Sequence, residues 1–393
     1  MYDFLVQAQS LFIYAQTLRR DFHSHPELGF KEYRTAGIVA RELNEIGLEV
    51  STGIGKTGVV ALLEGSKPGP TILLRFDMDA LPIQEETGAE YASQNPGVMH
   101  ACGHDGHTAV GLTVARILAA QRQNIPGAVK FVFQPAEEGL GGAESMINEG
   151  ILENPKPQFC LSLHFWNSEP VGWLGITPGP VMAASEVFSI NVIGRGGHGA
   201  APNLAVDPVV ASAHVITALQ SIVARNVSPL HTAVVTVTTV HGGDAHNVIP
   251  EKVSLTGTIR SFDPDVRKMV LQRFREVVQQ TAAALGCHVE IDLHSLTPAV
   301  QNNIEVTQIV RQVAEKLLPE AVIDNHYSTM GSEDMALFMQ EVPGCYFFIG
   351  SANHEKGLNA PHHHPHFDID ESALPVAAAL MSAAAVEFLN QPL

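Results

Sequence analysis

The segment His100–Thr108 (HACGHDGHT) concentrates three histidines, a cysteine and an aspartate around two glycines. Buried polar side chains cost free energy unless each finds a partner. A metal ion would partner several of them at once, and imidazole nitrogen and thiolate sulfur are ligands that zinc and its first-row neighbours prefer. The segment therefore predicts a metal site whose remaining ligands come from other parts of the chain.

Two adjacent glutamates, Glu137 and Glu138, follow an apolar segment in FQPAEEG. Taken alone, such a pair is most often a solvated turn. Beside a metal site, one carboxylate can bind the metal while the other takes a proton from metal-bound water and passes it to a leaving group. The pair is therefore a candidate metal ligand and a candidate general base.

Further candidate ligands lie near the ends of other apolar segments. Asp77 and Asp79 can ligate a metal directly or orient a ligand histidine. His164 ends the apolar segment LSLH, although a single histidine at a strand end is more often structural. The segment PHHHPHF, residues 361–367, adds four histidines. Such a run can bind metal by accident at a surface, and a function requires only one of the four.

Two more candidates lie in the second half of the chain. The glycines of GRGGHGA, residues 194–200, allow the backbone to approach a ligand and to present His198. An imidazole there could stabilise charge on a tetrahedral intermediate, or be an exposed histidine in a glycine-rich turn. Arg260 ends an apolar segment. A single arginine is usually a surface residue, but one that faces a cleft can bind a carboxylate through two hydrogen bonds.

The pattern of apolar segments predicts how these side chains are positioned. Strand-like runs alternate with helical spacing in the first part of the chain, which predicts an α/β fold. We expect a mostly parallel mixed sheet with helices on both faces. Ligands bind beyond the carboxyl ends of strands in such sheets, so the candidate residues can meet at one edge. The expected strands are 59–64, 71–76, 129–134 and 159–165, and the expected helices include 106–122 and 142–150.

A second pattern begins after Pro178–Pro180, which we interpret as a hinge. Its segments follow the order βαββαβ, which is typical of a ferredoxin-like domain. Asp263 and Gly286 are the start and stop signals of its second helix. A chain of 393 residues is long for one core. We therefore expect an inserted lid domain at 181–293, within a discontinuous catalytic metal-binding domain formed by residues 1–180 and 294–393.

Composition narrows the classes of protein to consider. The net charge of −18 disfavours nucleic acid as a partner. Four scattered cysteines argue against a disulfide scaffold and suit a reducing compartment. The N-terminal segment has the pattern of an amphipathic helix rather than of a signal peptide, and no apolar run is long enough to predict a membrane span. We expect a cytoplasmic protein.

In this order along the chain, nine motifs resemble a known family: DFHSHPELGF, RFDMDALPI, MHACGHDGHT, FQPAEEG, LSLHFWN, GRGGHGAAP, AHNVIPEKVSLTGTIRSF, GSEDMALF and HFDIDE. The family is the aminoacylase, hippurate hydrolase and indoleacetyl-amino-acid hydrolase group of dinuclear-metal amidohydrolases, which are relatives of metallopeptidases. Each motif is weak by itself, but the ordered set is specific, and the resemblance covers nearly the whole chain.

The resemblance implies two divalent metal ions per subunit (Zn, Mn, Co or Ni), bound between the catalytic domain and a lid that often mediates dimerisation. The implied metal ligands are Cys102, in a bridging position, His104, Glu138, His164 and His363, with His362 and His364 as alternatives to His363. Glu137 matches the general base, and Asp79 matches an aspartate that supports the site. The implied lid residues are His198, often supplied by the partner subunit, and Asn247 and Arg260, which hold the substrate carboxylate.

The implied reaction is hydrolysis of an N-acyl amino acid, with an acetyl, benzoyl or similar acyl group, to a carboxylic acid and a free amino acid. In this reaction a metal-bridging hydroxide would attack the amide carbonyl. The substrate is expected to be a small molecule. The protein is expected to be a homodimer or homotetramer. A dipeptidase or an N-carbamoyl-amino-acid hydrolase would share the metal core. A non-enzymatic metal-dependent binding protein would not need Glu137 or His198, and a metal-storage protein would not need Arg260.

Overall fold

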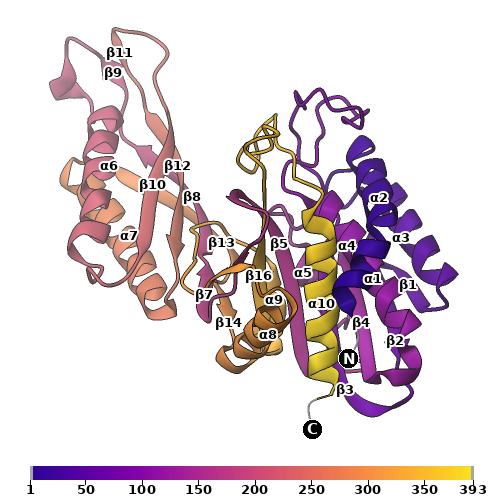
Figure 1. Ribbon diagram of the computed structural model, residues 1–393. Coiled ribbons are helices and arrows are strands. Elements are labelled where there is room, and N and C mark those ends of the chain that lie inside the picture. Colours follow the sequence, from indigo (N-terminus) through magenta and orange to yellow (C-terminus); the bar gives the residue numbers. More distant parts are fainter. Residues whose placement is uncertain (1–2, 391–393) are drawn as a thin grey trace. The chain divides into compact units, whose positions relative to one another are not determined.

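The computed structural model describes residues 3–390 and divides them into two compact units (Figure 1). Unit 1 contains the chain up to Val181, Gln301–Ser328 and the chain from Asp334 onward. Unit 2 contains Met182–Val300 and Thr329–Glu333. The boundary expected at residue 293 falls inside a strand, β13 (His288–Thr297), which belongs to unit 2.

Unit 1 is built on an eight-stranded mixed sheet with the strand order β1-β2-β4-β3-β5-β16-β6-β15. The neighbouring strands β4, β3, β5 and β16 are mutually parallel, whereas the pairs β1–β2, β2–β4 and β16–β6 are antiparallel. The strands are β1 (Glu49–Ile54), β2 (Gly58–Glu64), β3 (Lys67–Asp77), β4 (Pro126–Gln134), β5 (Phe159–Pro170), β6 (Trp173–Gly175), β15 (Val322–Asp324) and β16 (Gly344–Ala352). This confirms the predicted mixed sheet with a parallel centre.

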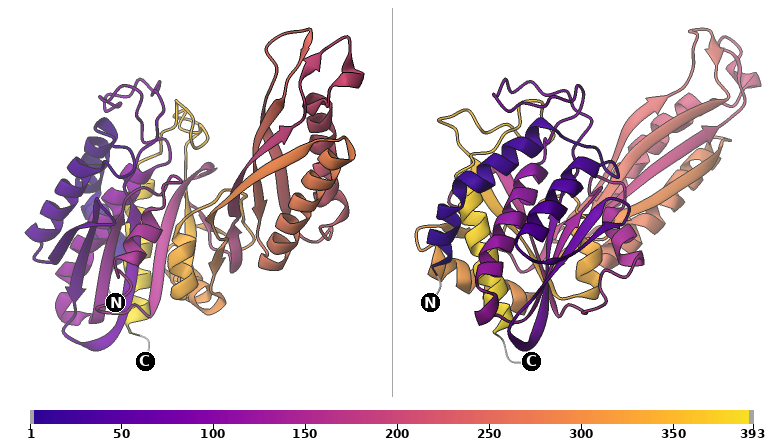
Figure 2. Two further views of the ribbon diagram at one scale, coloured as in Figure 1. Left: turned by 180° about the vertical axis from the view of Figure 1, so that it is seen from behind. Right: turned by 90° about the vertical axis from the view of Figure 1, so that its right-hand side faces the viewer.

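Helices cover both faces of this sheet, as predicted (Figures 1 and 2). Ile72, Leu74 and Phe76 of β3 belong to the core shared with α4, α8 and α10, while α5 and α9 contact strands from the other face. The helices of unit 1 are α1 (Phe4–Ser10), α2 (Phe12–Ser24), α3 (Tyr33–Glu45), α4 (His104–Ala120), α5 (Gly142–Asn148), α8 (Ile304–Leu317), α9 (Met335–Glu341) and α10 (Ala373–Leu389), with a 3₁₀ turn at Arg122–Asn124.

Unit 2 has the predicted βαββαβ order, with an antiparallel sheet β10-β12-β8-β13. Phe188, Ile190 and Val192 of β8 alternate into a core with α6 and α7, which lie side by side on one face of the sheet (Figure 2). The elements are β8 (Ala184–Ile193), β9 (Gly197–His198), a 3₁₀ turn at Pro202–Leu204, α6 (Pro208–Arg225), β10 (Ala233–His241), β11 (Val248–Ile249), β12 (Lys252–Ser261), α7 (Pro264–Ala284) and β13.

Among the described residues, α6 is long and apolar enough to cross a membrane by length and composition alone. Its apolar residues Ala211, Val215, Leu219 and Ile222 recur at helical spacing and are buried in the core of unit 2. Packing in that core accounts for part of the hydropathy of the helix, since 33% of its apolar window is buried whereas Val209 and Val210 are exposed.

Three expected boundaries differ from the structure. The strand β5 continues to Pro170, so His164 lies inside it rather than at its end, because β16 pairs with β5 beyond that point. Helix α4 begins at His104, two residues before the expected start. The expected hinge at Pro178–Pro180 contains the start of β7 (Gly179–Met182), which pairs with β14 (Val300–Asn302), a partner too remote in sequence for a local pattern to indicate.

Candidate functional site

Four segments of unit 1 bring the predicted ligands together. Cys102 and His104 lie at the start of α4, Glu137 and Glu138 in the turn after β4, His164 on β5, and His363 in the loop before α10. Because β3, β4 and β5 are parallel, the chain leaves β3 and β4 at the same edge of the sheet. The topology therefore explains why residues so distant in sequence share one site.

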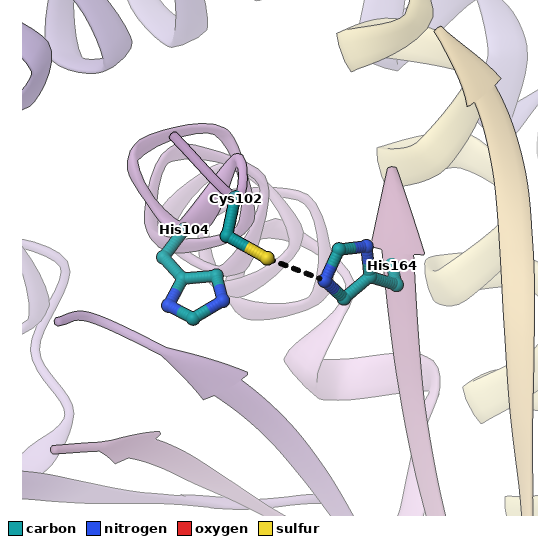
Figure 3. A group of neighbouring side chains, drawn as sticks. All are labelled: Cys102, His104 and His164. Atoms are coloured by element: carbon teal, nitrogen blue, oxygen red, sulfur yellow. Dashed lines mark hydrogen bonds between the residues drawn. The ribbon is translucent and has the colours of Figure 1, made fainter. Parts of the chain in front are cut away.

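A glycine at the start of α4 shapes the first part of this site. Gly103 adopts φ +88°, a left-handed conformation that residues with side chains rarely adopt. This turn lets Cys102 and His104, on either side of Gly103, face the same region (Figure 3). The Cys102 Sγ atom points at the His164 ring and lies 3.4 Å from its Nε2 atom.

Cys102 belongs to two groups of potential metal ligands. In one group, ligand atoms of Cys102, His104 and His164 all lie within 4.8 Å of one another, and in the other, those of Cys102, Glu138 and His363 do. The Nε2 atom of His363 is 3.2 Å from Glu138 Oε1. A single sulfur atom common to two such groups is the arrangement that a bridging ligand of two metal ions requires.

The backbone hydrogen bonds of the two candidate ligand histidines involve only one nitrogen of each ring. His104 Nδ1 is 2.9 Å from the backbone oxygen of Asp79, and His164 Nδ1 is 2.6 Å from that of Phe165. Each Nδ1 therefore carries a proton, and each Nε2 is the ring atom left to face a metal ion. Among the described residues, the buried Nε2 atom of His104 has no hydrogen-bond partner, which fits a metal ligand.

The electrostatics of the site also fit a divalent cation. Burial, with Glu138 and Glu137 nearby, raises the pKa of Cys102 well above its usual range. Burial lowers the pKa of His104, but Asp77 and Asp79 outweigh it and raise that pKa to about 10. Burial of Cys102 and negative charge around both residues thus favour their protonated forms, whereas a bound cation of charge +2 would favour thiolate and neutral imidazole.

Three other histidines of the two histidine-rich segments, His107, His362 and His364, have different partners. His107 Nδ1 lies 2.6 Å from Asp77 Oδ1, and its Nε2 accepts a hydrogen bond from the Phe165 N–H, so neither nitrogen is available. His362 Nε2 lies 2.9 Å from the Phe165 backbone oxygen, and the ring stacks on Trp166. His364 Nδ1 accepts from the His366 N–H. In the C-terminal segment, only His363 belongs to a group of potential ligands found among the described residues.

Glu137 and Asp79 lie beside the ligand cluster. Ligand atoms of Glu137, Glu138 and His104 lie within 4.8 Å of one another. The buried Asp79 accepts a hydrogen bond from the Glu138 N–H at 3.0 Å and lies 3.3 Å from His104 Nδ1. Asp79 thus contacts both the turn that carries the two glutamates and one of the ligand histidines.

The candidate residues of unit 2 do not all lie together. His198 on β9 is paired with Val248 on β11, directly after Asn247, and both His198 and Asn247 are exposed. These short strands lie at one end of the unit 2 sheet (Figure 1), where Lys252 pairs with Ile193. Arg260 pairs with Ser185 at the other end, and Lys252 and Arg260 are about 26 Å apart at 3.3 Å per strand residue.

Arg75 is a residue of the site that the sequence analysis did not identify. It is fully buried, and its guanidinium donates to Gln134, Asp77 and Asp334 at 2.6–2.9 Å. These bonds join the ends of β3 and β4 to the start of α9. A charged residue within the apolar run TILLRF was the signal available in the sequence, because buried charges are almost always paired.

The fold and the ligand cluster define the class of protein: this is a dinuclear-metal amidohydrolase with a parallel-centred α/β unit and a ferredoxin-like second unit. The chain belongs to the peptidase family M20/M25/M40, whose model matches residues 73–387.

Individual relatives agree with this assignment. The chain is 39% identical to Thermostable carboxypeptidase 1 of Saccharolobus solfataricus, covering 95% of each chain. It is 40% identical to N-acetyl-L-cysteine deacetylase of Bacillus subtilis (95% of this chain, 88% of the relative) and 41% identical to hippurate hydrolase of Campylobacter jejuni (86% and 88%). The solved structure of Bacillus subtilis YXEP, described as a dinuclear metal binding peptidase, matches with a TM-score of 0.85 and 34% identity, covering 98% of this chain and all of the other.

Proposed function

We propose that this protein hydrolyses the amide bond of N-acyl amino acids to a carboxylic acid and a free amino acid. The observation that carries the proposal is the position of Cys102 in two ligand groups with Glu137 beside them. Two of the relatives are named for the removal of an acyl group from an amino acid, as N-acetyl-L-cysteine deacetylase and hippurate hydrolase.

In the proposed mechanism, two divalent cations held by Cys102, His104, Glu138, His164 and His363 would polarise the carbonyl and lower the pKa of water. Glu137 accepts a proton from the attacking water as the new C–O bond forms. It then donates that proton to the leaving nitrogen as the C–N bond breaks. Asp79 holds the Glu138 backbone and the His104 ring in place during both steps.

The substrate carboxylate and the carbonyl oxygen are assigned to residues of unit 2, the proposed lid. Arg260 binds the carboxylate, and His198 stabilises charge on the carbonyl oxygen. Since Asn247 precedes β11, near the Lys252 end of β12, and Arg260 lies near the other end of β12, we infer that one copy of the chain supplies Arg260 to a site while a second copy supplies His198 and Asn247. This assignment requires a homodimer or a higher oligomer such as a tetramer. We propose the cytoplasm as the location.

The test is release of amino acid from a substrate panel. Chelated protein is resupplied with Mn²⁺, Zn²⁺, Co²⁺ or Ni²⁺ and given acetyl, benzoyl, indoleacetyl, succinyl and carbamoyl amino acids, dipeptides, and the α-carboxamide of each good substrate. Metal-dependent release from acyl amino acids, with KM much higher for the carboxamide, is the expected result. Release from dipeptides alone would identify a peptidase, the activity named in one relative. Release from carbamoyl compounds alone would identify a carbamoyl-amino-acid hydrolase.

A further inference from the structure

The turn that carries Glu137 is held by a carboxylate on each side. After Glu137, the Glu138 N–H donates to Asp79 Oδ2 at 3.0 Å. Before it, the Ala136 N–H donates to Glu32 Oε1 at 2.9 Å. Asp79 was expected at the site from the sequence, whereas Glu32 comes from the segment before α3, far away in the chain. Two hydrogen bonds thus fix the backbone on both sides of Glu137.

Burial and hydrogen bonds hold the side chain of Glu32 in this position. Its side chain is buried, with the residue 0% exposed, and its second oxygen accepts a hydrogen bond from the Thr57 hydroxyl. Burial raises the pKa of Glu32 above its usual value. A carboxyl group that is buried with backbone and hydroxyl donors as its partners serves to satisfy and orient those donors.

The residue that Glu32 holds has an unusual backbone conformation. Ala136 has φ +53°, a left-handed value that a residue with a side chain adopts only when its surroundings enforce it. Its carbonyl accepts from the Gly142 N–H at 3.1 Å, so both backbone polar groups of Ala136 are engaged. Gly29 packs against it so closely that a Cβ there would lie 3.0 Å from Ala136 Cα. If the backbone of Ala136 relaxed to a more common conformation, the following peptide would rotate. The side chain of Glu137, the next residue, would then point in another direction.

The segment that presents Glu32 is itself fastened beside Asp79. Leu28 forms a parallel bridge with Ala80, and the Ala80 N–H donates to the Glu27 carbonyl at 2.8 Å. The Glu27 carboxylate accepts from the N–H groups of Arg34 and Thr35 at the start of α3. Glu32 is therefore anchored to the same part of the chain as the carboxylate on the other side of the turn.

We propose that Glu32 is a positioning residue for amide hydrolysis, which orients Glu137 by accepting the hydrogen bond of the Ala136 N–H. The inference rests on the proposed function, in which Glu137 is the general base. A displacement of about 1 Å in a reacting group can cost roughly 100-fold in rate, so the loss of one oriented hydrogen bond is measurable in kcat.

The test compares three variants saturated with metal. Glu32→Met removes the acceptor without leaving a large cavity, and Glu32→Gln keeps an oxygen for Ala136. Glu42→Met makes the same change at a buried glutamate of α3 that bonds to Tyr14 and Arg116. We expect Glu32→Met to lower kcat about 10- to 100-fold, with KM within about threefold. Glu32→Gln should recover most of kcat, and Glu42→Met should retain it.

Hydrogen exchange at the peptide that contains Ala136 provides a readout independent of activity. Exchange should be faster in Glu32→Met and unchanged in Glu32→Gln. If Glu32→Met does not fold, Glu32→Asp, which withdraws the carboxylate by one methylene, should give the same changes in smaller size. Unchanged kcat in these variants, equal loss in Glu32→Gln, or unchanged exchange would overturn the proposal. Failure of the proposed function is distinct, because the parent protein would then be inactive on the panel or Glu137→Gln would stay active.

Discussion

Cys102 lies in surroundings that favour the protonated thiol as long as no cation is bound. Burial, with carboxylates nearby, raises its pKa, so the thiol keeps its proton and can donate it to His164 Nε2 at 3.4 Å. Its Sγ atom also belongs to both groups of potential metal ligands. The residue therefore makes physical sense as a metal ligand, and its removal should affect the protein chiefly through metal binding.

Replacement of Cys102 by alanine should reduce the metal content below two ions per subunit, because both ligand groups lose the same sulfur atom. Elemental analysis after dialysis measures this directly. Cys160→Ala is the matched control, since Cys160 is buried in β5 and its Sγ contacts the Val342 carbonyl. Retention of two metal ions by Cys102→Ala would contradict the bridging position.

Replacement of Glu137 by glutamine should keep the metal and lower kcat by roughly 10²–10⁴-fold, the usual contribution of a general acid or base. Glutamine has nearly the same shape but cannot accept and return the proton. Steady-state kinetics with metal analysis of the same sample tests this. Glu144→Gln, an exposed change on nearby α5, should behave as the parent protein. A near-normal kcat in Glu137→Gln would reject its assignment as the base.

The stability of the protein should depend on the protonation of His23. This buried ring contacts Asp105 and Glu85. Burial and Arg19 lower its pKa, but the two carboxylates outweigh them and raise it to about 9 from 6.5. Since the folded-state pKa is the higher one, the stabilisation is complete below about pH 6.5 and is lost as the pH rises through about 9. The free energy of unfolding in urea should fall over this range, and less steeply in His23→Gln.

At the scale of elements, the sequence predicted those whose signals are local. The cap of α7 is of this kind: Asp263, the expected start signal, accepts hydrogen bonds from the first backbone N–H groups of the helix. Strand β1 was not predicted, because its residues are mostly exposed and form no apolar run. The extent of β5 was also not predictable, since it depends on pairing with β16, nearly two hundred residues away.

The site was predictable to the same degree. Clustered residue types in HACGHDGHT and the adjacent glutamates indicated where the metal chemistry lies. They did not rank the histidines, because His104 and His107 are chemically identical until Asp79 and Asp77 engage them differently. Glu32 carried no signal, since a single glutamate before a helix has many ordinary roles. In each case the role of the residue depends on its hydrogen-bond partner, and that partner comes from a distant segment that only the fold brings close.

Removal of a helix cap should have a local and moderate cost. Asp263→Ala leaves the N–H groups of Asp265 and Val266 without their acceptor. We expect the free energy of unfolding to fall by about 1 kcal/mol. Chemical denaturation followed by circular dichroism measures the change. Asp292→Ala, an exposed change on β13, should have little effect, and an equal loss in both variants would show that the cap contributes nothing specific.

At the scale of the whole molecule, the metal ions should contribute to stability. Asp77, Asp79, Glu137 and Glu138 bring negative charge together in unit 1, and a cation that binds the folded chain shifts the equilibrium toward it. Chelation should lower the thermal midpoint by about 3 °C or more, and Mn²⁺ or Zn²⁺ should restore it with increasing concentration. The Cys102→Ala chain should respond much less. Equal midpoints with and without metal in the parent protein would contradict this coupling.

The order of the proposed ligands along the chain has a consequence for biosynthesis. Cys102, Glu138 and His164 precede the whole of unit 2 in the sequence, whereas His363 follows it. β16, which lies beside β5 in the sheet of unit 1, is also translated after unit 2. In a nascent chain, the early segments of unit 1 therefore lack β16 and His363 while the whole of unit 2 emerges from the ribosome. The full set of proposed ligands becomes available only after His363 has been synthesised, so binding of both metal ions must follow the synthesis of unit 2.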